Sequence, residues 1–140
     1  MANGREDVGP LAVRDFAAVA AEIRATRLPL LLMVTSQDCP YCHRLESEYL
    51  RPMWISGEYE GVTVLLRKLE VDQLREVRDF NGDVISVKDF QRRYKAFLTP
   101  TLLFLDDRGA QISERILGYN TPELFGGYIY RGIDEARARL

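Results

Sequence analysis

The sequence contains little of several residue types, and each shortage excludes a class of protein. Its 140 residues include two cysteines and one histidine, too few for a small disulfide scaffold or for a structural zinc site with four ligands. The longest apolar run, residues 28–34, contains a proline and is far too short to span a bilayer. Lys and Arg number 19 against 21 Asp and Glu, so no excess of positive charge indicates a nucleic-acid partner.

The remaining composition is that of one folded domain. Hydrophobic residues make up 46% and charged residues 29% of the chain, which argues against disorder. Ten glycines and six prolines are too few for a low-complexity polymer. We expect the polar residues 1–9 to form a flexible arm, and residues 10–140 to form a single domain with no linker or internal repeat.

Helical and extended patterns alternate in the first half of the chain. Pro10 suits the first turn of a helix whose apolar residues recur at helical spacing until Pro29 stops it. Residues 30–34 are continuously apolar, which is typical of a strand buried on both faces of a parallel sheet. Pro40 then starts a second helix, which we expect Pro52 to end or kink.

The middle of the chain combines a strand pattern at 62–71 with a hairpin signal. The Asn81-Gly82 pair lies between apolar residues and predicts a hairpin. Ser86, followed three residues later by Asp89, resembles the N-terminal cap of a helix. The apolar residues expected on that helix are Phe90, Tyr94 and Phe97.

Two strands and a final helix complete the pattern. Residues 101–105 and 112–117 have strand character and are separated by a short polar turn, and Pro122 begins the last helix. Helices therefore alternate with strands until two strands meet through a turn. This order predicts an α/β fold with a mixed central sheet and helices on both of its faces.

The two cysteines, Cys39 and Cys42, stand where the first buried strand ends and the next helix begins. A pair at this spacing closes too small a loop to stabilise the fold much, so it indicates a chemical use. Unpaired N–H groups and the positive dipole end of the helix would stabilise a thiolate at Cys39, while Cys42, one turn further in, would be more buried. In the predicted cycle, Cys39 attacks a substrate disulfide and Cys42 then attacks Cys39 to release the reduced substrate.

Four motifs in order resemble the thioredoxin superfamily, over the chain from Leu30 to the last helix. Cys39-Pro40-Tyr41-Cys42 carries the dipeptide typical of glutaredoxins. Residues 68–73 look like the central strand of thioredoxin and its following turn, Thr99-Pro100-Thr101 looks like the cis-proline motif, and Gly118 lies where the family has a glycine. The resemblance implies a thioredoxin-like three-layer α/β/α sandwich with a hairpin insertion before the third helix.

The same resemblance implies roles for individual residues. Cys39 would be the nucleophile and Cys42 the resolving thiol, and their redox-active disulfide would be the protein's only cofactor. The bond before Pro100 would be cis, with Pro100 facing the cysteine pair, and the backbone of Thr99 would pair with an extended substrate. Substrate contacts are accordingly expected at Pro40, Tyr41, Thr99, Pro100 and Gly118.

One departure from the family concerns the proton of the resolving thiol. The buried aspartate of thioredoxin falls on Met33, whereas its partner lysine is kept as Lys68, which is either a modulator of Cys42 or a surface lysine. With the aspartate missing, Glu46, Glu70 or water would have to accept the proton of Cys42.

A second departure is Asp38, which replaces the tryptophan that precedes the first cysteine in the family. Its negative charge would raise the pKa of Cys39 by repulsion and so oppose the helix dipole. Asp38 and Lys68 are therefore the residues that we expect to modulate the redox pair.

The region 51–93 is longer than in a plain thioredoxin or glutaredoxin. Its insertion at 79–83 resembles a branch of bacterial thioredoxin-like proteins that are usually exported. We therefore expect a periplasmic protein whose signal peptide has been removed. The alternative is a cytoplasmic protein, because Met1 leads directly into polar residues.

Three functions compete at this point. The first is a monomeric thiol–disulfide oxidoreductase that reduces protein disulfides and is itself reduced by a thiol electron donor. The second is a glutaredoxin-type reductase of glutathione mixed disulfides that uses Cys39 alone. The third is a non-catalytic binding module with the same fold. His43 also completes a Cys-X-X-Cys-His string, the c-type haem attachment motif, but its setting between strand and helix favours an ordinary surface residue.

Overall fold

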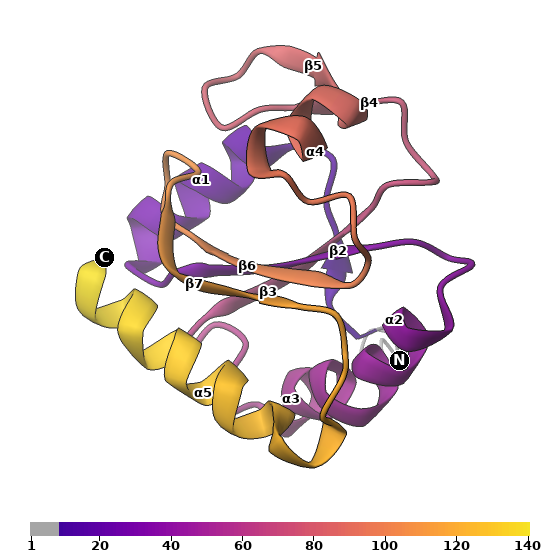
Figure 1. The fold of residues 1–140 in the computed structure, drawn as a ribbon. Helices are drawn as coiled ribbons and strands as arrows, with labels where there is room; N and C mark the ends of the chain where they lie inside the picture. Colours follow the sequence, from indigo (N-terminus) through magenta and orange to yellow (C-terminus); the bar gives the residue numbers. More distant parts are fainter. Residues whose placement is uncertain (1–8) are drawn as a thin grey trace, which may run out of the picture.

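A five-stranded mixed sheet forms the centre of the computed structural model, which describes residues 9–140 (Figure 1). The strand order is β1-β3-β2-β6-β7. The strands are β1 (Leu11–Ala12), β2 (Leu30–Thr35), β3 (Leu65–Glu70), β6 (Thr101–Leu105) and β7 (Gln111–Leu117). β3 runs parallel to β1 and β2, while β6 is antiparallel to both β2 and β7. All six residues of the central strand β2 are buried, which explains its continuous apolar sequence.

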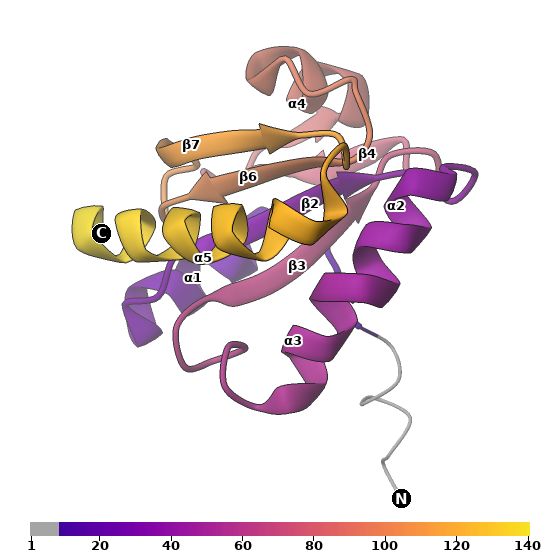
Figure 2. The same ribbon diagram turned by 60° about the horizontal axis from the view of Figure 1, so that its bottom comes forward.

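Helices cover both faces of this sheet and produce three layers, as predicted (Figures 1 and 2). Helices α1 (Phe16–Thr26) and α4 (Val87–Tyr94) pack on one face. The other face carries α2 (Pro40–Leu45), the π-helix η2 (Glu46–Leu50), α3 (Arg51–Ser56) and α5 (Pro122–Arg139). None of the helices within residues 9–140 combines the length and hydropathy that crossing a bilayer requires.

The start of the first helix differs from its prediction. Pro10 does not begin a helix, because Leu11–Ala12 form an edge strand beside β3. The helix begins only after Asp15, whose carboxylate accepts a hydrogen bond from the N–H of Ala18 (3.1 Å) and caps the first turn. Most of the predicted arm lies outside the described residues, and Gly9, its last residue, is buried.

The helix that follows the cysteines does not end at Pro52. It continues to Ser56, and its middle section, η2, has the wider turns of a π-helix. Pro52 lies in the first turn of α3, where these wider turns accommodate a residue with no N–H to donate. Gly57 ends the helix in a left-handed conformation (φ 77°).

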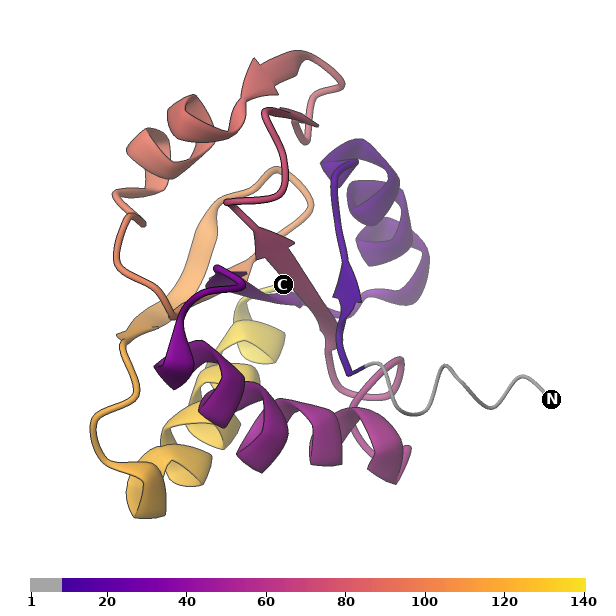
Figure 3. The same cartoon turned by 90° about the vertical axis from the view of Figure 1, so that its right-hand side faces the viewer.

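The insertion forms the predicted hairpin, made of β4 (Glu76–Arg78) and β5 (Val84–Ser86), and leads into α4. Ser86 caps α4 by accepting a hydrogen bond from the N–H of Asp89 (3.0 Å). The helix ends at Tyr94, so the prediction that Phe97 lies on it is wrong, and Phe97 is exposed in the following loop. Figure 3 shows the hairpin and α4 on the side of the sheet away from α2 and α3.

Candidate functional site

Cys39 and Cys42 form a disulfide at the junction of β2 and α2, with their Cα atoms 5.2 Å apart. Cys39 is the N-cap residue of α2, and its Sγ accepts a hydrogen bond from the N–H of Cys42 (3.2 Å). Cys42 is almost fully buried (1% exposed), whereas Cys39 is only partly buried. The two sulfurs therefore differ in access, and an incoming disulfide reaches Cys39 first.

The loop before β6 lies against this disulfide. Sγ of Cys39 is 3.6 Å from the carbonyl oxygen of Thr99, and the Thr99–Pro100 peptide bond is cis. Gly118, at the end of β7, donates its N–H to the carbonyl oxygen of Pro100 (2.8 Å) and has a positive φ of 72° that favours glycine. Thr99, Pro100 and Gly118 are distant in sequence from the cysteines, but the pairing of β2, β6 and β7 brings them to one place.

Three large apolar side chains are exposed on the segments that carry the site residues: Tyr41, Phe97 and Leu98. Tyr41 follows Cys39-Pro40 on α2, and the residue is 58% exposed. Phe97 and Leu98 immediately precede Thr99 and are exposed to a similar extent. Neither of these two residues was predicted at the site from the sequence. The available signal was a pair of large apolar residues directly before the Thr-Pro motif.

A group of charged side chains lies on the α2 side of the site. Nζ of Lys68 is 2.9 Å from a carboxylate oxygen of Glu46 and 3.9 Å from one of Glu70. Lys68 is 15% exposed, so it is not a freely solvated surface lysine. Both carboxylates that the sequence offers as proton acceptors are thus held by one ammonium group. The three side chains line a cavity of about 380 Å³, together with Thr35, Ser36, Gln37, His43, Ser47 and Arg51.

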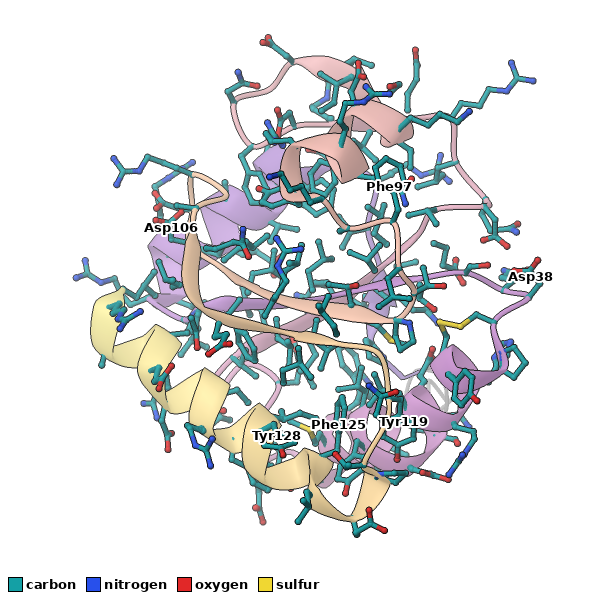
Figure 4. All side chains as sticks on the ribbon, viewed as in Figure 1. Asp38, Phe97, Asp106, Tyr119, Phe125 and Tyr128 are labelled. Atoms are coloured by element: carbon teal, nitrogen blue, oxygen red, sulfur yellow. A yellow bond between two sulfur atoms is a disulfide. The ribbon has the colours of Figure 1, made fainter. Side chains whose placement is uncertain are left out.

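Asp38 lies on the loop between β2 and Cys39 (Figure 4). Its carboxylate accepts a hydrogen bond from the hydroxyl group of Ser36. Asp72 holds the same loop from the end of β3, because it accepts hydrogen bonds from the Ser36 hydroxyl (3.3 Å) and the N–H of Gln37 (3.0 Å). The loop that carries the first cysteine is therefore fixed by polar contacts, and the effect of Asp38 on Cys39 stays a prediction.

His43 is exposed on α2, and its Nε2 is 2.6 Å from the carbonyl oxygen of Gln37. Its ring thus joins the helix to the loop before Cys39. Within residues 9–140, no three His, Cys, Asp or Glu side chains are grouped in a way that could hold a metal ion.

An aromatic contact that was not predicted from the sequence joins the cysteine-bearing helix to α5. The Tyr119 hydroxyl donates to the carboxylate of Glu48, and the Arg44 guanidinium lies over the Tyr119 ring (5.5 Å). This hydrogen bond lowers the pKa of Glu48, whereas burial first and then the same bond raise the pKa of Tyr119. Tyr119 also packs edge-on against Phe125 of α5, with ring centres 4.8 Å apart (Figure 4).

Comparison with known families identifies the class of the protein. The family model of the thioredoxin-like domain matches residues 16–130, and the chain belongs to this family. No curated protein sequence matches it.

Solved thioredoxin structures share the fold. A poplar thioredoxin h is 19% identical, with a TM-score of 0.61 and coverage of 88% of this chain and 96% of the poplar chain. Thioredoxin from Fasciola hepatica is also 19% identical, with a TM-score of 0.55 and coverage of 87% and 98%. The oxidised form of mitochondrial thioredoxin 3 from Saccharomyces cerevisiae is 18% identical, with a TM-score of 0.54 and coverage of 84% and 92%.

Proposed function

We propose that this protein is a thiol–disulfide oxidoreductase that reduces disulfide bonds in protein substrates through Cys39 and Cys42. One observation carries the proposal: the two cysteines form a disulfide in which the first sulfur is accessible beside Thr99 and the second is buried. An accessible nucleophile backed by a buried resolving thiol is the arrangement that dithiol exchange requires.

The reaction begins with the reduced protein. The Cys39 thiolate attacks one sulfur of the substrate disulfide, forms a mixed disulfide and expels the other substrate sulfur as a thiolate. Cys42 then loses its proton and attacks Sγ of Cys39, which releases the second substrate thiolate and forms the Cys39–Cys42 disulfide. Two electrons have passed to the substrate, and a dithiol donor returns them to the protein by the reverse exchange.

The substrate segment is expected to lie across Thr99, Pro100 and Gly118 in extended form. The pairing of β6 and β7 ends at the hydrogen bond from the N–H of Gly118 to the carbonyl oxygen of Pro100. The carbonyl oxygen of Thr99, one residue earlier, lies 3.6 Å from Sγ of Cys39, so the backbone of Thr99 is available to pair with a substrate next to the reactive sulfur. The exposed side chains of Tyr41 and Leu98 would then contact apolar side chains of the substrate next to its disulfide.

Insulin reduction by dithiothreitol tests the proposal. The wild-type protein should accelerate the precipitation of insulin chains, and Cys39→Ser should abolish the acceleration while leaving the fold intact by circular dichroism. Cys42→Ser should trap the substrate on Cys39 as a mixed disulfide. Deglutathionylation that survives in Cys42→Ser would support glutaredoxin-type chemistry instead. Absence of both activities and of any trapped partner would indicate a binding module.

The proposal also covers the oligomeric state, the cofactor requirement and the cellular location of the protein. We expect a monomer without any cofactor beyond the disulfide, located in the periplasm, as the resemblance of the insertion at 79–83 implies. Fractionation of cells that express the full-length gene product tests the location, and recovery in the cytoplasm would contradict it.

A further inference from the structure

The proposed exchange requires that Cys42 give up a proton while it is shielded from solvent. Cys42 is 1% exposed and packs in the apolar cluster that contains Met33 and Leu45. Burial among apolar side chains disfavours the thiolate, and bulk water is not in contact with this sulfur. Of the β2 residues on this face, Leu31 and Met33 are apolar, and Thr35 carries only a neutral hydroxyl, which is too weak a base to keep the proton. The acceptor must therefore come from another element.

Glu46 is placed to fill this role. It lies four residues after Cys42 in the same continuous helix, and its backbone N–H donates to the carbonyl oxygen of Cys42. Residues at this spacing lie on one helix face with their Cβ atoms about 5–6 Å apart. A glutamate side chain at this position is long enough to reach the thiol. The Glu46 side chain is 14% exposed, so its carboxylate is itself largely removed from solvent.

Lys68 fixes the position of this carboxylate. Its Nζ is 2.9 Å from Oε2 of Glu46, and Lys68 lies directly opposite Met33 in the parallel pairing of β2 and β3. Side chains paired in this way point to the same face of a sheet, so the ammonium group lies over the face that Met33 and Cys42 occupy. Lys68 thus holds the Glu46 carboxylate on the face of the sheet that also carries the buried thiol.

Glu70 is a weaker candidate than Glu46. It is 3.9 Å from Nζ of Lys68, more exposed (23%), and located at the end of β3 rather than on the cysteine-bearing helix. Its carboxylate also accepts a hydrogen bond from Nε2 of Gln37 (3.4 Å), which directs it toward the loop. Glu70 therefore provides a matched control for Glu46, since both carboxylates contact the same lysine.

The cavity of about 380 Å³ connects this group of side chains with solvent. Both Glu46 and Lys68 line it, so a proton taken from Cys42 can pass to water from Glu46 without crossing the apolar core. The other charged or titratable groups that line it are Glu70 from β3, His43 from α2 and Arg51 from α3.

From this geometry we propose that Glu46 accepts the proton of Cys42 in the resolving step, and that Lys68 is the residue that positions Glu46. The proposal rests on the proposed dithiol exchange. As the S–H bond of Cys42 breaks, the proton moves to the Glu46 carboxylate and the electron pair stays on sulfur, which attacks Sγ of Cys39. The Cys39–Cys42 bond forms, the bond from Cys39 to the substrate sulfur breaks, and the substrate leaves as a thiolate. The proton then passes from Glu46 to water in the cavity.

Reaction of the fully reduced protein with 5,5′-dithiobis(2-nitrobenzoate) separates the two steps in one stopped-flow trace. Attack by Cys39 releases one thionitrobenzoate, and attack by Cys42 on the mixed disulfide releases the second. Glu46→Gln should leave the first release unchanged and slow the second by about tenfold or more near neutral pH. The defect should shrink as pH rises, because hydroxide takes over as the proton acceptor. Glu46→Asp, which keeps the carboxylate, should restore most of the rate and serves as the second variant if Glu46→Gln does not fold.

The outcomes of this experiment are distinguishable. A first release that fails in the wild-type protein contradicts the proposed function itself. A normal second release in Glu46→Gln overturns the role of Glu46 and leaves the proposed function standing. Glu70→Gln should slow the second release by clearly less than Glu46→Gln, and an equal loss would show that only the charge around Lys68 matters.

Discussion

At the scale of one residue, the buried charge of Asp79 contributes to the stability of the folded protein. Its side chain is 8% exposed, and its two oxygens accept hydrogen bonds from the guanidinium of Arg93 at 2.7 and 2.8 Å. The pKa of Asp79 is lowered, mainly because its carboxylate accepts hydrogen bonds from Arg93. Burial acts in the opposite direction and has a smaller effect. The pair joins the loop of the β4–β5 hairpin to α4.

Asp79→Asn should destabilise the protein by about 2 kcal/mol at neutral pH, since a hydrogen-bonded charge pair is lost. The pKa is lower in the folded state, so the contribution is fully present above the unfolded value of about 4 and is lost as pH falls through the lower folded value. Urea unfolding of both proteins at neutral pH and in acid measures this. A stability difference that stays constant into strong acid would contradict the assignment.

At the scale of the element, two of the three glycines in helix α5 have opposite surroundings. A Cβ on Gly132 would overlap the ring of Phe104, which is fully buried on β6. A Cβ on Gly127 would have no heavy atom within 4 Å. Gly132 therefore permits the close approach of α5 to the sheet, whereas Gly127 only lowers the helix propensity.

Gly132→Ala should destabilise the protein by about 1–3 kcal/mol, because the added methyl group overpacks a core that has no room for it. Gly127→Ala, the matched control on the same helix, should stabilise it by about 0.5–1 kcal/mol. Thermal unfolding of the two variants tests both signs. A neutral result for Gly132→Ala would mean that α5 moves away from β6 at little cost.

The elements also show which features can be read from the sequence. Strand β2 was predicted from its apolar run and the start of α4 from Ser86, because burial and caps are local signals. Asp15 is an equally local cap, but the preference of proline for the first turn of a helix points to Pro10 instead. Glu46 and Lys68 were each named from the sequence, but their contact joins residues 22 positions apart and depends on how the helix crosses β3. Such contacts exist only once the fold is known.

At the scale of the whole molecule, apolar exposure near the disulfide is expected to decide how well protein substrates bind. Leu98→Ser should raise the KM for insulin by about fivefold, because roughly 1 kcal/mol of apolar burial is lost from the complex. The reaction with 5,5′-dithiobis(2-nitrobenzoate) should stay unchanged, since this small probe does not need the surface. Val84→Ser is the control, because Val84 is similarly exposed but lies on the hairpin. Equal effects of the two substitutions would exclude a specific role for Leu98.

The antiparallel pairing of β2 and β6 places Cys39 and Pro100 at the same end of two adjacent strands. Val34, located shortly before Cys39 in the chain, is paired with Thr101, the residue after Pro100. A slip of one residue in this ladder would shift the two loops by about 3.4 Å and separate the sulfur from the Thr99 carbonyl. The hydrogen bonds between β2 and β6 therefore determine how the reactive atoms are aligned. Loss of native strand pairing on heating would abolish the activity at the same temperature at which the core unfolds.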